Sequence, residues 1–399
     1  MSVIPLSPLL VPATFCGPGK PAVPSILDRP QVQFLSAARM ALALGLRHAG
    51  VTAAQEVLVP AYSSASMITP ILLLGATPVF YRLRPDLSAD LDDLAQKVTP
   101  RSAAVLGVNF FGFSQDWGAL RDFADRAGLV LAEDCAHALY GSWRGTPLGT
   151  FGDFAIASLT KFLPVWDGGL LAVNSLPPIR LATRRPSLRT QLKAIFNLLE
   201  EAADSGRNPM IRPLLAALQG GSRRARPPAP TLATPAAMPS STLPPAGESL
   251  RRDVTGAVDP DRLLDAPTAI SRLVAGAAAR RRIADRRREA YALYQEGLAG
   301  VPGCALPFQP SAEEVPYMVP VWVEDLARLH PRWIEKRIPM QRFAEFLWPG
   351  LPADACPVAT GMSRHLVQFP CHQDLAPAQI QAIVETVRGD LRAARPAAS

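Results

Sequence analysis

The chain has 399 residues, of which 48% are hydrophobic and 19% charged, so it is long enough to bury a sizeable core in one or more domains. With 27 Gly and 41 Pro it is not a disordered or collagen-like chain, and no apolar stretch approaches the roughly 20 residues that a bilayer span needs. The net charge of +7 suggests nucleic-acid binding, but the arginines lie in separate clusters without interleaved aromatic residues. We therefore expect neither a nucleic-acid partner nor a membrane span.

The five cysteines are widely spaced and form no CxxC pair, a pattern that argues against a disulfide framework and against a zinc site. The segment from Met1 to Phe15 contains several prolines and no basic residue, unlike a secretory signal. We expect a cytoplasmic protein with no bound metal.

Short apolar runs alternate with amphipathic stretches between residues 34 and 175, as in a β/α sheet protein. The expected strands are Val57–Val59, Pro78–Leu83, Ala103–Val108, Leu129–Ala132, Phe154–Ser158 and Leu170–Val173. The expected helices are Ala37–His48, Ala65–Leu74, Leu87–Lys97 and Asp116–Ala127. Continuous apolar strands with helical crossovers predict a mostly parallel sheet sandwiched by helices, with ligands at the carboxyl ends of the strands.

The composition changes after residue 204. Residues 205–250 are rich in Pro, Ala, Ser and Arg and predict a flexible insertion. Helical periodicity resumes at Pro260 and runs to about Leu298, with many arginines on one face. A strand at Met318–Val323 and helices at Arg332–Arg337, Gln341–Leu347 and Pro377–Arg388 then predict a smaller α+β domain.

These patterns divide the chain into four parts. They are an N-terminal segment at 1–33, a large α/β domain at 34–204, the Pro/Arg-rich insertion at 205–250, and a helical connection with the small C-terminal domain at 251–399.

An acidic residue ends one of the apolar strands. Leu129–Ala132 is followed by Glu133 and Asp134, and His137 comes three residues after Asp134. A parallel strand would carry the Asp134 carboxylate to the edge of the sheet where ligands bind. An aspartate at a strand end also commonly caps a turn, and a single histidine is often structural, so neither residue identifies a function by itself.

A lysine follows the next strand, in a chain that has five lysines against 36 arginines. Lys161, three residues after Ser158, is expected to be partly desolvated, so that its amine can attack an aldehyde. The Ser158 hydroxyl could donate to a phosphate, and Gly168 and Gly169 allow a close approach of the chain. Pyridoxal phosphate needs a lysine for its aldehyde and an acid for its ring nitrogen, and Lys161 and Asp134 could supply both. The alternative is a strand-end lysine without a function.

Seven short motifs together resemble the DegT/StrS-type sugar aminotransferases, which belong to the pyridoxal-phosphate fold type I group. They are Glu56–Tyr62, Gly75–Phe80, Thr99–Arg101, Asn109–Gly112, Glu133–His137, Leu148–Asp153 and Phe369–Gln373. The resemblance spans most of the chain except the extreme N-terminus and residues 205–250.

The resemblance implies a role for four residues. Asp134 matches the acid that pairs with the pyridinium nitrogen, and His137 matches the Gln or His near the phenolic oxygen of the cofactor. Lys161 matches the lysine that binds the cofactor as a Schiff base and later moves the substrate proton. Ser158 matches a phosphate contact.

Other positions depart from the family pattern. Ala37, Ala38 and Arg39 stand at the phosphate-binding helix start, where many members have Ser-Gly-Thr, so backbone N–H groups or the Arg39 side chain would replace a hydroxyl. Arg39 either strengthens phosphate binding or pairs with a surface acid. Ser64 stands at the position of the ring-stacking aromatic residue, so stacking must come from elsewhere or be weaker. The Ser-x-x-Lys spacing and residues 166–169, Trp-Asp-Gly-Gly, mark an atypical side branch.

The implied function is transfer of an amino group from an amino acid, L-glutamate, to a keto sugar carried by a nucleotide, in polysaccharide or secondary-metabolite biosynthesis. The enzyme would be a homodimer with small-molecule substrates. Another pyridoxal-phosphate reaction on the same scaffold is an alternative, but the dehydratases of the family carry His at the position of Lys161.

A second class of function is a degenerate homologue that serves as a binding or regulatory protein. Ser64 and the insertion favour it, whereas Asp134 and Lys161 count against it, because a buried unpaired lysine would be costly. The alternatives for Arg364, His365 and His372, near the end of the chain, are a position beside the substrate or a structural role.

Overall fold

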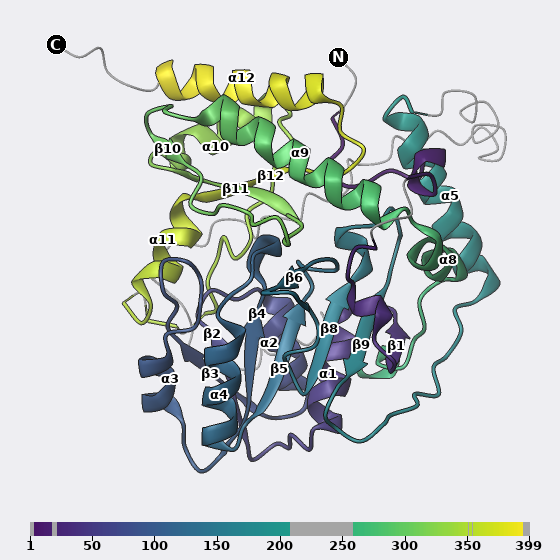
Figure 1. Cartoon of the computed structure of the whole chain (residues 1–399), viewed down its shortest axis with the longest axis vertical. Helices are drawn as coiled ribbons and strands as arrows, with labels where there is room; N and C mark the ends of the chain where they lie inside the picture. Colours follow the sequence, from purple (N-terminus) through teal and green to yellow (C-terminus); the bar gives the residue numbers. More distant parts are fainter. Residues whose placement is uncertain (1–3, 18–21, 208–257, 350, 353, 394–399) are drawn as a thin grey trace.

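The structure is a computed structural model that describes residues 4–17, 22–207, 258–349, 351–352 and 354–393. The insertion expected at 205–250 lies, beyond residue 207, outside the described residues. The described chain contains a seven-stranded sheet, a three-stranded sheet and a two-stranded hairpin of β6 (Ser142–Trp143) and β7 (Thr146–Pro147) (Figure 1). The four-part division of the chain stays a prediction.

The seven-stranded sheet has the order β1-β9-β8-β5-β4-β2-β3. Its strands are β1 (Val32–Leu35), β2 (Glu56–Pro60), β3 (Thr77–Tyr81), β4 (Ser102–Val108), β5 (Val130–Cys135), β8 (Phe154–Ser158) and β9 (Gly169–Val173). All pairs from β3 to β8 are parallel, and β9 is antiparallel to both of its neighbours. The expected mostly parallel sheet is confirmed, with β1 added as an edge strand that the sequence did not predict.

Helices cover both faces of this sheet. They are α1 (Ala38–His48), α2 (Ala65–Leu73), α3 (Leu91–Lys97) and α4 (Trp117–Ala127). Figure 1 shows α1 and α2 behind the strands and α4 in front of them. Strands β2, β8 and β9 are therefore buried along their whole length, which explains their continuous apolar sequence.

The third of these helices starts four residues later than expected. Leu87 has a φ of 64°, a left-handed conformation that a helix cannot contain. Asp90 then forms the N-cap, and its carboxylate accepts hydrogen bonds from the N–H groups of Asp92 and Asp93. A turn residue and a cap, rather than hydrophobic periodicity, therefore fix the start of α3.

Helical periodicity was expected from Pro260 to about Leu298, and most of this range is helical, but in three separate elements. The chain forms a 3-10 turn at Pro260–Arg262, then α8 (Ala269–Ala277) and α9 (Arg280–Leu298). Ala278 is extended, and the next N–H, that of Ala279, donates to the carbonyl of Thr14 in the N-terminal segment. A tertiary contact thus breaks a helix that the local pattern would continue. A further helix, α5 (Leu188–Asp204), was not predicted.

The smaller sheet is antiparallel and consists of β10 (Cys304–Ala305), β11 (Met318–Val323) and β12 (Leu366–Pro370). It is accompanied by α10 (Leu326–Glu335), α11 (Pro357–His365) and α12 (Pro377–Ala393). Figure 1 shows α9 and α12 side by side over this sheet. The expected strand at Met318–Val323 and the expected C-terminal helix are confirmed.

The helix expected at Gln341–Leu347 was wrong. Gln341 instead forms a β-bridge with Gln368 of β12, and the N–H of Phe343 donates to the Gln368 side-chain oxygen at 2.7 Å. The apolar spacing of this segment reflects contacts with β12 and with aromatic side chains of the large sheet, not one face of a helix.

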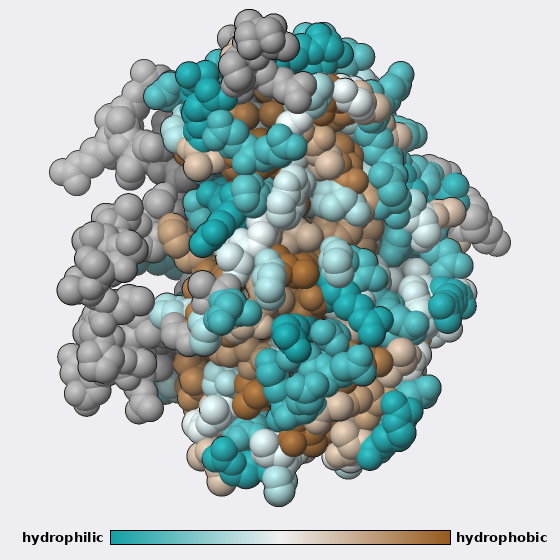
Figure 2. Space-filling model, turned by 90° about the vertical axis from the view of Figure 1, so that its left-hand side faces the viewer, coloured by the Kyte–Doolittle hydropathy of each residue, from teal (hydrophilic) through white to brown (hydrophobic). Residues whose placement is uncertain are grey.

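No helix within the described ranges is long and apolar enough to cross a membrane. All five cysteines are free thiols. Figure 2 shows one face of the molecule, on which hydrophobic residues reach the surface between hydrophilic ones.

Candidate active site

Asp134 is delivered by β5 to the carboxyl edge of the large sheet. It pairs in register with Val108 of β4 and Ile156 of β8, and it is 4% exposed. One carboxylate oxygen accepts a hydrogen bond from the N–H of Ala136 at 2.7 Å, and the other has no partner in the part of the chain that the structure describes. Burial raises the pKa of Asp134 to about 6, although the Ala136 hydrogen bond and the charge of Lys161 oppose the rise.

The adjacent Glu133 points to the opposite face of the strand and has a different environment. Its carboxylate accepts from the N–H groups of Gly149, Phe151 and Gly152 at 2.7 to 3.3 Å. These bonds hold the loop that leads into β8. Glu133 is thus a saturated structural acid, whereas Asp134 keeps an oxygen free for a ligand.

Lys161 ends a single 3-10 turn, Leu159–Lys161, directly after β8. Its Nζ has no hydrogen-bond or ion-pair acceptor among the described residues, and it lies 5.0 Å from the centroid of the Tyr317 ring. By contrast, Lys97 is paired with Asp93 and Lys336 with Asp390. A half-buried lysine without a carboxylate partner matches the requirement for a covalent cofactor lysine.

His137 is 5% exposed and lies between two aromatic rings. Tyr317 stacks on it at a centroid distance of 4.7 Å and Phe111 at 5.8 Å. Its Nδ1 accepts the N–H of Phe111 at 3.3 Å, so the proton of the neutral ring is on Nε2. Burial and the charge of Lys161 hold the pKa of His137 well below its usual value. The side chain is therefore a neutral Nε2–H donor near the acid and the lysine.

The expected phosphate-binding helix start is present at α1. Ala37 is the N-cap and makes no side-chain cap bond, and the N–H groups of Ala38 and Arg39 have no acceptor in the described chain. Gly169 packs so closely that a Cβ on it would lie 2.2 Å from the carbonyl carbon of Ala37. The glycine thus brings the strand after the Lys161 loop against free donors at the positive end of a helix.

Ser158 and Arg39 are the two other residues that were expected to contact the phosphate. Ser158 is buried, and its hydroxyl lies 3.1 Å from the hydroxyl of Thr160, a residue that the sequence interpretation did not single out. Arg39 is exposed and has no carboxylate partner in the described ranges. Burial of part of its stem and the charge of Arg262 lower its pKa. The interpretation of Arg39 as half of a surface ion pair is therefore not observed.

Ser64 is the N-cap of α2, and its hydroxyl bonds to that of Ser66 at 2.8 Å. It offers no ring, as expected. Aromatic side chains nevertheless gather next to His137: Tyr62 is fully buried, and Phe343 packs edge-on to both Tyr62 and His137.

The three C-terminal candidates separate in the structure. Arg364 is exposed on α11, and His365 stacks on Trp322 with its Nδ1 at 3.1 Å from the carbonyl of Val323, a structural arrangement. His372 is buried, and its Nε2 lies 3.1 Å from the carbonyl of Pro5. Burial lowers the pKa of His372 to about 3, so its ring is neutral and holds the N-terminal segment in place.

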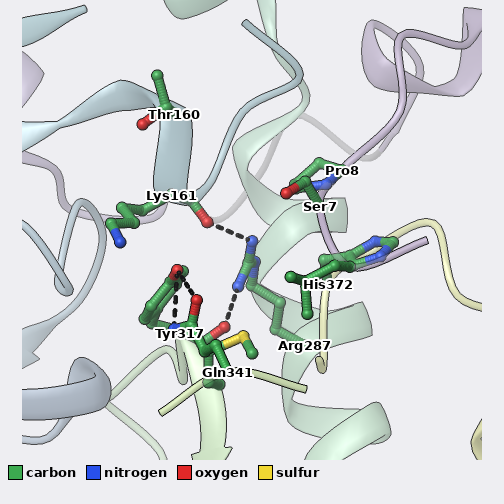
Figure 3. Close-up of a pocket in the computed structure, with 10 residues that line it drawn as sticks. Ser7, Pro8, Thr160, Lys161, Arg287, Tyr317, Gln341 and His372 are labelled. Carbon is green, nitrogen blue, oxygen red and sulfur yellow. Dashed lines mark hydrogen bonds between the residues drawn. The ribbon is translucent and has the colours of Figure 1, made fainter. Parts of the chain in front are cut away.

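A cavity of about 20 Å³ lies beside Lys161, room for a single water molecule. Figure 3 shows Lys161, Arg287, Tyr317, Gln341 and His372 around it. Lys161 and Thr160 line the cavity, whereas Asp134 and Ser158 do not.

The donor set at this edge fits pyridoxal phosphate. Asp134 has a free carboxylate oxygen for a protonated ring nitrogen, and Lys161 has a free amine for an aldehyde. The start of α1 has free N–H donors for a phosphate, and His137 has a free Nε2–H. Each group lacks a partner in the described protein and matches one part of the cofactor.

Residues 31–184 match the model of the DegT/DnrJ/EryC1/StrS aminotransferase family. This segment is similar to that family. It contains the acid, the histidine, the lysine and the α1 start, and it confirms the resemblance inferred from the motifs.

Two relatives illustrate the likeness in sequence. The GDP-perosamine synthase of Vibrio cholerae is 34% identical over 139 residues, which are 34% of this chain and 38% of that protein. The dTDP-4-dehydro-2,3,6-trideoxy-D-glucose 4-aminotransferase of Saccharopolyspora spinosa is 37% identical over 147 residues, 36% of this chain and 38% of that protein. The matched part is thus well under two thirds of the length of these relatives.

The fold extends the likeness to almost the whole chain. The structure of DesV from S. venezuelae in complex with a ketimine intermediate has a TM-score of 0.63 at 21% identity, and the match covers 93% of this chain and 87% of that one. The aminotransferase from Psychrobacter cryohalolentis has a TM-score of 0.63 at 16% identity, with 92% and 89% covered. The expected fold class, a mostly parallel sheet sandwiched by helices plus a small α+β part, is confirmed.

Proposed function

We propose that the protein is a pyridoxal-phosphate-dependent aminotransferase that moves an amino group from an amino acid to a keto sugar. One observation carries the proposal: the amine of Lys161, one oxygen of Asp134 and the first N–H groups of α1 all lack partners in the described chain, although the acid is nine-tenths buried. Buried polar groups are normally paired, so unpaired ones at one edge of a sheet indicate a ligand.

Pyridoxal phosphate, when bound, supplies an electron sink for the carbon that loses its proton. The free amine of Lys161 would hold the aldehyde of the cofactor and could carry a proton to and from the substrate carbon. Asp134, ionised above about pH 6, keeps a proton on the ring nitrogen. The Nε2–H of His137 would donate to the phenolic oxygen, and the α1 start with Ser158 and Arg39 would hold the phosphate.

The choice of substrates is supported by the relatives. GDP-perosamine synthase and the dTDP-dehydro-sugar aminotransferase both have names that specify sugars attached to a nucleotide. We infer a keto sugar carried by a nucleotide as the acceptor and L-glutamate as the donor, with a place in polysaccharide or secondary-metabolite biosynthesis.

We also propose a homodimer that acts in the cytoplasm. Large apolar side chains are exposed at one-turn spacing on α5, where Leu188 is 75% and Leu192 58% exposed, and Leu273 on α8 is 61% exposed. Such a stripe favours a protein partner. Sedimentation or light scattering of the parent and of Leu192→Glu tests this: a dimer that dissociates in the variant supports the proposal, and a monomeric parent contradicts it.

The activity is tested by absorbance spectroscopy of the purified protein with pyridoxal phosphate, before and after L-glutamate, next to Lys161→Ala. We expect a visible band that requires Lys161 and is lost on addition of glutamate as the cofactor takes its amine form. Nucleotide-linked keto sugars are then screened for return of the band. Absence of any band with the parent protein would contradict the enzyme and leave the binding or regulatory homologue as the better account.

A further inference from the structure

Arg287, in the middle of α9, has an unusual environment for a charged residue. Its side chain is fully buried, and none of its hydrogen bonds goes to a carboxylate within the described ranges. Asp374 is the carboxylate whose charge acts on Arg287, and it is already paired with Arg282 at 2.9 Å. A buried charge without a counter-ion is costly, but the four hydrogen bonds of Arg287 satisfy buried acceptors that an apolar side chain would leave unpaired. What these bonds hold in place is therefore the question that the arginine raises.

The donors of Arg287 converge on the backbone beside the reactive lysine. One Nη2–H donates to the carbonyl of Lys161 itself at 3.1 Å (Figure 3). Nη1 donates to the carbonyls of Pro316 and Tyr317 at 3.1 and 2.9 Å. The guanidinium thus joins the main chain of the lysine to the main chain of the residue whose ring lies under the lysine amine.

A second contact reaches the next residue along the loop. The Nε–H of Arg287 donates to the side-chain oxygen of Gln373 at 3.1 Å, and the Gln373 amide donates to the carbonyl of Phe162 at 3.0 Å. The guanidinium carbon also lies 4.4 Å from the centroid of the Phe162 ring. Two consecutive carbonyls, those of Lys161 and Phe162, therefore accept hydrogen bonds from Arg287 of α9 and from Gln373, which follows β12.

The other end of the lysine loop is attached to α8. Asp167 accepts from the N–H and hydroxyl of Thr268 and from the hydroxyl of Ser271, at 2.6 to 3.1 Å. This carboxylate thus holds Thr268, the N-cap residue of α8, and Ser271 in its first turn. Helices α8 and α9 together fix both ends of the loop from Lys161 to Asp167.

We infer that Arg287 is a positioning residue for Lys161: its planar fork of N–H donors holds the lysine backbone at a fixed place relative to Tyr317, with Asp167 fixing the far end of the loop. The inference rests on the proposed function. It requires the geometry of a guanidinium and not just its charge, because an ammonium cannot donate in three fixed directions within one plane.

The test compares Arg287→Lys, which keeps the charge, and Arg287→Met, which removes it, with Arg281→Met on the same helix. Arg281 is a matched control because its ion pair, with Asp285, lies within α9. Each protein is first examined without cofactor by hydrogen exchange of the amides in residues 159–168, several of which bond within the loop. Each is then loaded with pyridoxal phosphate, and the bound cofactor and the fraction fixed to Lys161 by borohydride are measured separately.

We expect amide exchange in the loop to be at least tenfold faster in both Arg287 variants than in the parent. We also expect the fraction of bound cofactor fixed to Lys161 to fall severalfold, while Arg281→Met behaves as the parent. Failure of Arg287→Lys to restore the parent values would show that the fork is needed, whereas full restoration by lysine would overturn the inference in favour of charge.

Gln373→Met serves as a second variant should Arg287→Met not fold, because it removes the bridge to Phe162 and keeps Arg287. It should accelerate exchange at the loop by a smaller factor. Parent-like exchange and parent-like fixation in the folded variants would contradict the positioning role. Failure of the proposed function looks different: the parent itself would then fix no cofactor.

Discussion

The carboxyl edge of the large sheet and the surface of α9 both carry charged side chains, but they differ in whether those side chains have partners. On α9, all the arginines but Arg287 have an acid within ion-pair distance: Arg280 with Asp28, Arg281 and Arg288 with Asp285, Arg282 with Asp374 and Arg286 with Glu289. At the sheet edge, Asp134 and Lys161 keep atoms without partners. Pairing therefore separates structural charges from those available to a ligand.

The same comparison explains why the arginine-rich helix does not indicate nucleic-acid binding. Its guanidinium groups are already bonded to acids or carbonyls of the chain itself, and a phosphate backbone would have to compete for them. Residue type and number suggested a basic surface, whereas the hydrogen bonds show a helix fastened to its surroundings.

The largest expected effect comes from Lys161→Ala. Turnover should fall by at least about 10³-fold, because the amine both attaches the cofactor and moves the proton. The free energy of unfolding should change by less than about 1 kcal/mol, since the amine has no ion pair to lose beyond its contact with Tyr317. A transaminase assay measures the turnover, and urea unfolding measures the free energy of unfolding. Lys97→Ala is the control: it loses an ion pair with Asp93 and should keep turnover.

Asp134→Asn should lower activity and raise the stability of the cofactor-free chain. The pKa of Asp134 is about 6 in the folded chain against 3.8 in the unfolded chain, so its burial costs stability as pH rises through 6. The substitution should therefore raise the free energy of unfolding by up to about 3 kcal/mol at pH 8 and by almost nothing at pH 4. Turnover should fall at least about 10²-fold.

Asp153→Asn should change the free energy of unfolding in the direction opposite to Asp134→Asn. Its carboxylate bonds to Arg121 and to the N–H of Leu131, which lower its pKa, so its contribution to stability is present at neutral pH and lost in acid. Denaturant titrations of both variants between pH 4 and 8 measure these trends. Destabilisation by Asp134→Asn at pH 8 would be inconsistent with a ligand-binding acid held at a cost to the fold.

His137 should have an intermediate effect. His137→Phe keeps an aromatic ring between Phe111 and Tyr317 but removes the Nε2–H donor, and kcat/KM should fall about tenfold, the value of a hydrogen bond to a charged group. His137→Gln should retain more activity because its amide can still donate. Since burial holds the histidine neutral, the pH profile of the parent between 5 and 8 should not change shape in either variant.

The smallest effect is expected at Ser64. Ser64→Phe would supply a ring at the position where the family stacks one, and offset stacking adds about 0.5 to 1.5 kcal/mol, so cofactor affinity should rise between about twofold and tenfold. Ser66→Phe, two residues along the same helix, is the control. Fluorescence titration with pyridoxal phosphate measures both, and unchanged affinity in Ser64→Phe would indicate that the stacking face is already occupied by another ring.

Some elements could be predicted from the sequence because local rules decide them. The expected strands Leu129–Ala132 and Phe154–Ser158 are apolar runs between turn residues, a pattern typical of a sheet covered on both faces, and they fall within or overlap β5 and β8. Lys161 was identifiable because lysine is rare in this chain. Ala37 could be placed because the family resemblance aligns it with a phosphate-binding helix start, even without a capping side chain.

Other features depended on contacts between distant segments. Arg287 belongs to a run of arginines that are indistinguishable in sequence, and its burial follows from the packing of α9 against the Lys161 loop. Tyr317 lies beside the lysine because the small sheet folds back over the large one. The end of helix α8 at Ala277 and the pairing of Gln341 with Gln368 likewise follow from partners far along the chain.

The sequence by itself predicted the proposed cofactor chemistry, through an acid and a scarce lysine that follow two buried strands, because strand burial and residue type are local properties. Tertiary structure decided which charges remain free, which arginine is buried and which ring faces the lysine. These outcomes are sums of contacts across more than a hundred residues of chain, where hydrogen-bond geometry, not local propensity, sets the free energy.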